Sequence, residues 1–256
     1  MRYLEKEAED TRVDELFLEL SSETRLSLLR ILETSNLKTQ EIANRIGMTA
    51  TEAVRQLQRL TDALLIQRNP DGSYSITEYG RTMLDLAKSM EFVFEHKGYF
   101  STHDLRQIPS QFVSRIGELS KTKLSLDTME TMDVGQRILS EAKEFSFATG
   151  EGRAPALMIP IMNEQVRKGV KMKFIVPESQ VPTSAFAPNV ETRGLSFIPV
   201  IMVVSEREAA ICFRFIGGRA DYAGFIGADE VFRNWVNDLF LYYWNRASRY
   251  PIPKEE

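Results

Sequence analysis

The stretch "EIANRIGMTATEAVRQLQRL", Glu41–Leu60, decides the fold of the N-terminal part of the chain. Its apolar residues recur at helical spacing on both sides of Gly47, which predicts two short helices joined by a sharp turn. A small side chain at Ala43 lets the two helices cross closely, and Gly47 tolerates the positive φ angle that the turn needs. The stretch therefore predicts a helix-turn-helix.

The flanking segments extend this pattern. Upstream, apolar residues at helical spacing predict two helices over residues 11–33. Downstream, "LLIQRNPDGSYSITEYGRTML" predicts strands over 65–68 and 73–76 around a turn at 69–72, and then a helix from Glu78 to about His96. The expected helix N-caps are Ser21 or Ser22, Thr39, Thr49 or Thr51, and Thr77. This order of elements predicts a winged helix-turn-helix.

Composition and charge narrow the class of protein. The chain has 256 residues, of which 43% are hydrophobic and 27% charged, as in an ordinary folded protein of one large or two small domains. A formal charge of -4 argues against a protein that binds nucleic acid with most of its surface. Cys212 is the only cysteine, so no internal disulfide can form. No apolar signal stretch follows Met1, and no apolar run is long enough to span a membrane, so we expect a cytoplasmic protein.

The hairpin followed by "ITEYGRTML" resembles the winged helix of archaeal and bacterial regulators of the ArsR type. The resemblance implies double-stranded DNA as the partner, read by the helix after Gly47 and by the wing. Arginines four residues apart on that helix can reach phosphates or a guanine edge, and a glutamine can pair with adenine. The expected DNA-binding residues are Lys38, Thr39, Thr49, Thr51, Arg55, Gln56 and Arg59, with Arg68 and Ser73 on the wing.

Two features weaken this expectation. The first is Glu52, which lies among the expected contacts and repels phosphate. Asp71 at the wing tip is also acidic, but the turn that it makes explains it. From Lys38 to Arg81 there are six basic residues (38, 45, 55, 59, 68, 81) against five acidic ones (41, 52, 62, 71, 78), which predicts modest, dimer-dependent affinity. The alternatives are a helical bundle that contacts only other proteins and a polar face that is merely solvated.

The phrase "HDLRQIPSQFVSRIGEL", residues 103–119, resembles the opening of the C-terminal domain of archaeal regulators of the methanogenesis-regulatory-protein type. That domain is common beyond methanogens, so the resemblance implies no pathway. We expect a DNA-binding domain over 1–97, a helical linker over 98–128 and an α/β domain over 129–256. His103 and Asp104 suggest a metal or hydrolase dyad, but no Cys/His/Asp cluster accompanies them. We therefore expect no metal site, and Asp104 is expected to begin a helix.

The last part of the chain alternates between helix and strand. Helices over 134–144 and 156–168 alternate with strands at "FSFATG" and "VKMKFIVPE", which predicts a crossover and a partly parallel sheet. Two further strands, "LSFIPVIMVVS" and "AAICFRFIG", meet at a turn over 206–208. The segment Asp229–Tyr250 is expected to be an amphipathic helix that packs on the sheet. This half resembles the phospholipase-D-like sensor domains of some archaeal regulators, without the enzyme's histidine-x-lysine motif.

The loop "TGEGRAP", residues 149–155, is a candidate ligand site, because a helix N-terminus can hold an anionic metabolite, although an ordinary connector is the favoured interpretation of the loop itself. A further alternative is a domain that only stabilises a dimer. Cys212 lies in an apolar strand and is expected to be a small buried hydrophobe. The candidate effector ligands are Thr149, Arg153, Arg214 and Arg219.

Two classes of function follow. The first is a homodimeric transcriptional regulator without cofactor or catalysis, in which DNA affinity responds to a small ligand. The second is an enzyme or nucleotide-binding protein that carries a winged-helix adaptor, although no Walker loop, GxSxG or complete catalytic set is found. The expected dimer surface is the residue 13–20 helix together with the apolar stripe Met83, Leu86, Ala87, Met90 and Val93 or Phe94.

Overall fold

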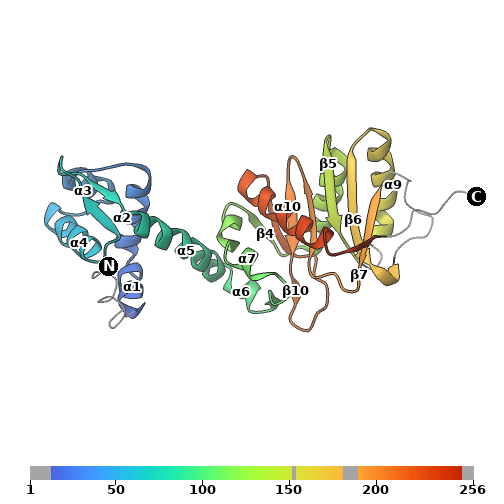
Figure 1. The fold of residues 1–256 in the computed structure, drawn as a ribbon, viewed down its shortest axis with the longest axis horizontal. Coiled ribbons are helices and arrows are strands. Elements are labelled where there is room, and N and C mark those ends of the chain that lie inside the picture. Colours follow the sequence, from blue (N-terminus) through green and yellow to red (C-terminus); the bar gives the residue numbers. More distant parts are fainter. Residues whose placement is uncertain (1–12, 152–153, 181–189, 250–256) are drawn as a thin grey trace, which may run out of the picture. The chain divides into compact units, whose positions relative to one another are not determined.

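The computed structural model describes residues 13–151, 154–180 and 190–249 (Figure 1). Arg153, an expected ligand residue, lies outside the described residues. The chain divides into two compact units, Met1–Lys88 and Ser89–Glu256. Within the described ranges, no helix combines the length and apolar character needed to cross a membrane.

The first unit is a winged helix-turn-helix. Its elements are α1 (Val13–Leu20), α2 (Glu23–Thr34), α3 (Thr39–Ile46), α4 (Ala50–Asp62), β1 (Ile66–Arg68), β2 (Tyr74–Ile76) and the first part of α5 (Glu78–Glu95). β1 and β2 pair as an antiparallel hairpin, with Ile66 opposite Ile76. The predicted order of helices, wing and helix is confirmed. The expectation that Thr39 caps a helix is wrong, because Thr39 is the first residue of α3 and Lys38 holds the cap position.

Local contacts explain why this unit folds as it does. Ser22, Thr49 and Thr77 accept hydrogen bonds from backbone N–H groups three residues on, as N-caps do. Gly80 lies where α5 passes the wing, and a Cβ atom there would stand 1.9 Å from the carbonyl oxygen of Leu65. Only glycine allows this close approach. Leucine and isoleucine side chains from all these elements form the core, including Leu28, Leu29, Leu32, Ile42, Leu57 and Leu60.

Among its described residues, the second unit is built around one mixed sheet of eight strands. Their order is β12-β7-β6-β5-β8-β9-β11-β4, with β5, β6 and β7 parallel and the other pairs antiparallel. A small second sheet pairs β3 with β10. The strands are β3 (His103–Asp104), β4 (Lys123–Ser125), β5 (Phe145–Thr149), β6 (Lys171–Pro177), β7 (Glu191–Leu195), β8 (Ile201–Ser205), β9 (Ala209–Cys212), β10 (Arg214–Phe215), β11 (Gly224–Gly227) and β12 (Ser248–Arg249).

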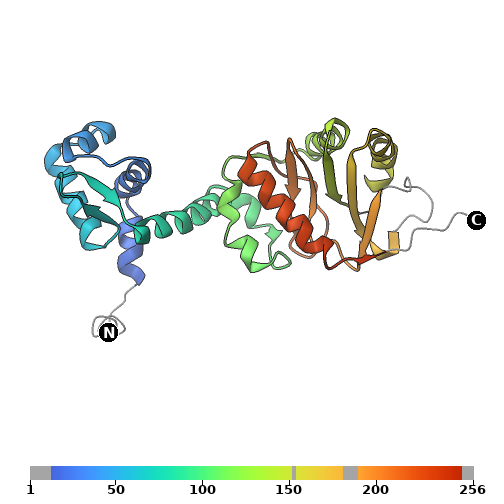
Figure 2. The same cartoon turned by 45° about the horizontal axis from the view of Figure 1, so that its top comes forward.

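Helices cover both faces of the large sheet, as Figure 2 shows for α10 on one side and α9 on the other. The helical segments are α6 (Lys97–Phe100), α7 (Ser110–Val113), η1 (Ile116–Leu119), α8 (Thr128–Glu141), α9 (Ala154–Arg167), η2 (Glu178–Gln180) and α10 (Glu230–Trp244). Phe232, Trp235 and Leu239 of α10 are fully buried against the sheet, as predicted. The predicted parallel crossover from β5 through α9 to β6 is also confirmed.

Residues 98–128, expected to be a linker, lie within the second unit. The Tyr99 hydroxyl donates to the carbonyl of Ala223 at 3.0 Å, and the Trp235 indole donates to the carbonyl of Phe112 at 3.3 Å. These long-range bonds join the segment to the sheet and to α10. Asp104, expected to begin a helix, lies in β3 and accepts hydrogen bonds from the backbone and guanidinium of Arg106.

Three strand and helix expectations need correction. The apolar run 195–205 is not one strand, because Pro199 has no N–H to give to a ladder and β8 begins at Ile201. The run 209–217 is also divided: β9 stays in the large sheet, whereas β10 pairs with β3. The last helix ends at Trp244 rather than Tyr250, and residues 248–249 form an edge strand.

Candidate nucleic-acid interface

The turn between α3 and α4 sets the direction of the exposed helix. Gly47 has φ 77° and ψ 35°, the left-handed conformation that ends many helices, and its N–H donates to the carbonyl of Ala43 at 2.9 Å. Met48 donates to the same carbonyl at 3.0 Å. Ala43 is buried, so the small side chain and the glycine have the roles that the sequence predicts.

One face of α4 packs into the core and the other is exposed. Ala53, Leu57 and Leu60 are fully buried. The opposite face presents a mixture of hydroxyl, apolar, amide and guanidinium groups at spacings of three and four residues, from Thr51, Val54, Arg55, Gln58 and Arg59. Such a surface offers a donor for guanine, an amide for adenine and an apolar contact for a thymine methyl group.

Val54 and Gln58 were not among the residues predicted to bind DNA. Val54 is 54% exposed, and Gln58 donates from its amide to Asp62 at 2.7 Å. Val54 lies three residues after Thr51 and Gln58 three residues after Arg55, so helical spacing was a signal that could have identified them.

The two predicted arginines of α4 are exposed and each is paired with one carboxylate. Arg55 Nη2 lies 2.9 Å from Glu52 Oε1, and Arg59 Nη2 lies 2.6 Å from Glu19 Oε1. The hydrogen bond that Arg59 donates to Glu19 raises the pKa of Arg59, whereas bonds donated by Gln56 and Arg55 lower the pKa of the Glu52 carboxyl. The Arg55–Glu52 pair is exposed on both sides and therefore weak, so a phosphate can compete for Arg55 at little cost. Glu19 is only 13% exposed and also pairs with buried Arg25 at 3.0 Å, so Arg59 is held more firmly than Arg55.

Gln56, predicted to contact DNA, is instead 7% exposed. Its Oε1 accepts from Arg25 Nη1 at 3.2 Å, and its amide nitrogen donates to Glu52 at 2.6 Å. Arg25 is itself buried on α2 and donates to the main-chain carbonyls of Leu18 and Glu19. Gln56 therefore ties α4 to α2, and the prediction that it faces DNA is corrected.

The wing presents one of its two predicted contacts. Arg68 is exposed at the end of β1. Ser73 is buried, and its hydroxyl donates to Asp71 Oδ1 at 2.7 Å and accepts from the amide of Asn69 at 2.9 Å. Ser73 therefore stabilises the turn and is not a DNA contact, which corrects its prediction. The same bonds lower the pKa of the Asp71 carboxyl and explain the acidic residue at this position.

The remaining predicted contacts surround the turn. Lys38 and Thr49 are exposed at the N-caps of α3 and α4, and Thr39 is half-buried in the first turn of α3. The Lys38 backbone N–H is occupied by the Glu41 carboxylate at 2.8 Å, which leaves its side-chain ammonium as the group facing solvent. Two helix starts and the exposed face of α4 thus lie in one continuous part of the fold.

The predicted anion ligands of the second unit are not assembled into such a surface. Arg214 is buried and makes a two-pronged ion pair with Glu151, with both N–O distances 3.0 Å. It also donates to the carbonyls of Gly218 and Ile198. A guanidinium with all these acceptors has no free side for an anion, so its expected role is corrected.

Two further predicted ligands differ from one another. Thr149 is buried at the end of β5, where its hydroxyl donates to the carbonyl of Val200. Arg219 is exposed, and its guanidinium lies 4.8 Å from the centre of the Phe215 ring.

Cys212 is buried as expected, and burial raises the pKa of its thiol well above the usual range. Across residues 13–151, 154–180 and 190–249, no group of three or more His, Cys, Asp or Glu side chains is placed to hold a metal.

Comparison with known proteins gives a partial sequence match. No protein-family model matches the chain. A methanogenesis regulatory protein, FilR1 of Methanothrix harundinacea, is 22% identical over 170 residues. The aligned region is 62% of this chain and only 37% of that relative. The sequence similarity is thus to a protein named as regulatory, over part of its length.

Two solved structures share low similarity with the chain. TrmBL2, an archaeal chromatin protein with a novel mode of DNA binding, aligns over 97% of this chain and 98% of its own, at 14% identity and a TM-score of 0.42. Nuc, a phospholipase D family member from Salmonella typhimurium, aligns over 46% of this chain and 89% of its own, at 11% identity and a TM-score of 0.37.

Proposed function

We propose that this protein is a DNA-binding transcriptional regulator that acts as a homodimer and catalyses no reaction. The observation that carries the proposal is the exposed face of α4, where Arg55 and Arg59 project beside Val54 and Gln58 from a helix whose other face is fully buried. A rigid helix with this mixture of groups suits the major groove. The partial similarity to a regulatory protein supports the same class.

The exposed face of α4 has little net positive charge, and this affects how it would bind DNA. Arg55 and Arg59 are each balanced by a carboxylate, so one unit has few free cations to neutralise phosphates. Two copies related by a two-fold axis double the number of contacts and read two half-sites. Dimerisation is therefore part of the proposed function.

The stripe along α5 supports a dimer. Leu86, Met90 and Phe94 follow each other at intervals of four residues and are 51%, 58% and 68% exposed. Met83, also predicted for this surface, packs instead against the core of the first unit, and Ala87 is buried. Three large apolar side chains in one exposed row on a helix are typical of a helix-pairing surface. α1 adds exposed Val13 and Phe17.

The proposal is tested by selecting bound duplexes from a random DNA library with the full-length protein. We expect enrichment of an inverted repeat whose half-sites are about one helical turn apart. Met90→Glu should shift the protein from dimer to monomer in sedimentation and weaken binding to that repeat, while Glu95→Gln on the same helix should do neither. A library that shows no enrichment over its starting composition would rule out sequence-specific binding.

A further inference from the structure

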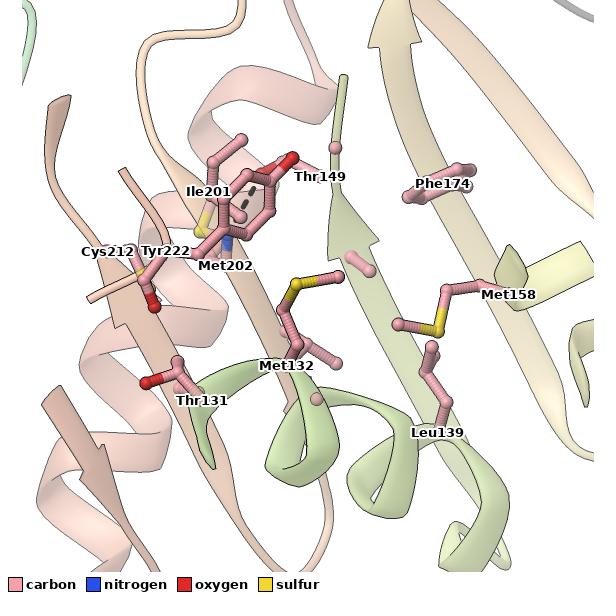
Figure 3. A pocket seen from close by; sticks show the side chains of 15 residues that line it. Thr131, Met132, Leu139, Thr149, Met158, Phe174, Ile201, Met202, Cys212 and Tyr222 are labelled. Carbon is pink, nitrogen blue, oxygen red and sulfur yellow. Dashed lines mark hydrogen bonds between the residues drawn. The ribbon is translucent and has the colours of Figure 1, made fainter. Parts of the chain in front are cut away.

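The second unit contains a cavity of about 70 Å³ between α8 and the large sheet, partly open to the surface (Figure 3). It lies beside the carboxyl end of β5, where Thr149 and Gly150 border it. Met132 and Leu139 extend toward it from α8, and Met158 approaches from α9. Methionine side chains are flexible and polarisable, so they can adapt the cavity to molecules of different shape.

The hydroxyl groups on the cavity wall are already occupied. The Thr149 hydroxyl donates to the carbonyl of Val200 at 2.6 Å and accepts from the N–H of Met202 at 3.0 Å. The Thr131 hydroxyl donates to the carbonyl of Asp127 at 3.1 Å. Neither hydroxyl can donate to a ligand without losing its bond within the protein.

The two other polar side chains on the wall have partners as well. The Tyr222 hydroxyl donates to the carbonyl of Glu151 at 3.2 Å, and the Cys212 thiol donates to the carbonyl of Tyr222 at 3.3 Å. An anion would lose its hydration here and find no free side-chain donor among the described residues of the wall. An apolar molecule would lose nothing by entering.

Gly135 shows that the space is maintained by the sequence. It lies in the interior of α8, where glycine is less favourable than alanine. A Cβ atom there would meet only Val203 Cγ1, at 3.9 Å, which is an ordinary van der Waals contact. Neither backbone conformation nor crowding therefore requires glycine, and its effect is to leave part of the cavity unfilled.

We infer that this cavity is a binding site for a small, uncharged, apolar molecule. This ligand class differs from the anion that the sequence predicts. Arg214, one of the predicted anion ligands, is held by Glu151, and the wall of the cavity is apolar. The site lies wholly within the second unit, so the inference goes beyond the proposed DNA binding and does not depend on it. An engineered apolar cavity of about 150 Å³, roughly twice this volume, stays dry and accepts benzene or xenon. The cavity here is smaller but is partly open to the surface, so a ring can enter it from that side.

The test uses the full-length protein labelled at its methionine methyl groups, titrated with benzene and, separately, with benzoate. Benzene should shift the Met132, Met158 and Met202 methyl signals in NMR spectra in a saturable way and leave those of Met83 and Met90 unchanged. Benzoate, which has the same ring with a negative charge, should produce no saturable shift.

Two variants complete the test. Gly135→Ala should raise the melting temperature, since it adds helix propensity and fills space, and should weaken benzene binding severalfold. Gly135→Leu should abolish benzene binding; if it does not fold, the alanine variant alone decides. The inference is overturned if benzene gives no saturable shift, if benzoate binds equally well, or if Gly135→Ala binds benzene like the wild type. No DNA is present in these experiments, so their outcome does not depend on whether the protein binds DNA.

Discussion

Arg55 in the first unit and Arg214 in the second are both predicted from sequence to meet an anionic partner, yet their surroundings are opposite. The Arg55 side chain is 70% exposed and contacts one carboxylate, Glu52. The Arg214 side chain is 7% exposed, forms a two-pronged pair with Glu151 and also donates to two carbonyls. The first guanidinium can exchange its partner for a phosphate, whereas the second can only hold its own unit together.

The two arginines differ in whether the sequence pattern predicts their surroundings. On α4, the helical period separates a polar face from an apolar one, and Arg55 falls clearly on the polar face. In "AICFRFIG" the charged residue stands among apolar ones on a short strand, and the segment does not reveal its neighbour. The partner, Glu151, lies 63 positions earlier in the chain.

The largest effect is expected at the buried arginine. Arg214→Ala leaves the Glu151 carboxylate without its partner, and breaking a buried ion pair in this way costs about 3–5 kcal/mol of unfolding free energy. Urea unfolding measures the loss, and the matched control is the exposed Arg219→Ala, expected to cost at most about 1 kcal/mol. Equal stability of the two variants would mean that Arg214 is free, and the comparison would fail.

A smaller effect separates neighbours on α4. Gln56→Ala removes the acceptor of buried Arg25, so we expect the first unit to lose about 1–3 kcal/mol of stability. Gln58→Ala, which removes an exposed amide of the same type, should change stability by no more than about 0.5 kcal/mol. Denaturant titrations of both variants give the comparison directly. If Gln56→Ala proves as stable as Gln58→Ala, the buried role of Gln56 is wrong.

The smallest effect is expected from the carboxylate that accompanies Arg55. Glu52→Gln removes a negative charge from the first turn of α4 and releases Arg55 from an ion pair, so DNA affinity should rise roughly twofold to fivefold at low salt. The gain should shrink as salt is added, because exposed charges are screened. Weaker binding by this variant would show that Glu52 positions Arg55 for DNA rather than competing with it.

The first unit could be predicted well because its signals are local. The Gly47 turn, the Thr77 cap and the four-residue wing turn each depend on residues close in sequence. The error at Gln56 comes from a distant contact, because Arg25 on another helix bonds to it. The error at Ser73 is local, because Asp71 and Asn69 of its own turn hold its hydroxyl.

The second unit could be predicted only in part for the same reason. The crossover from β5 to β6 follows from alternating helix and strand patterns, whereas the pairing of β10 with β3 joins segments more than a hundred residues apart. Such pairings are decided by packing and leave no local pattern. The apolar cavity could not be predicted because its wall comes from several strands and two helices.

The central claim, that α4 contacts DNA, is tested most directly by one titration. Wild type and Arg55→Ala are titrated with the same selected duplex at fixed salt, and both are checked for unchanged thermal unfolding. We expect Arg55→Ala to bind the duplex about tenfold to a hundredfold more weakly, because the Arg55 side chain would contact a base or a phosphate. Its stability should stay the same, because the side chain is exposed. Equal affinity of the two proteins would contradict the account.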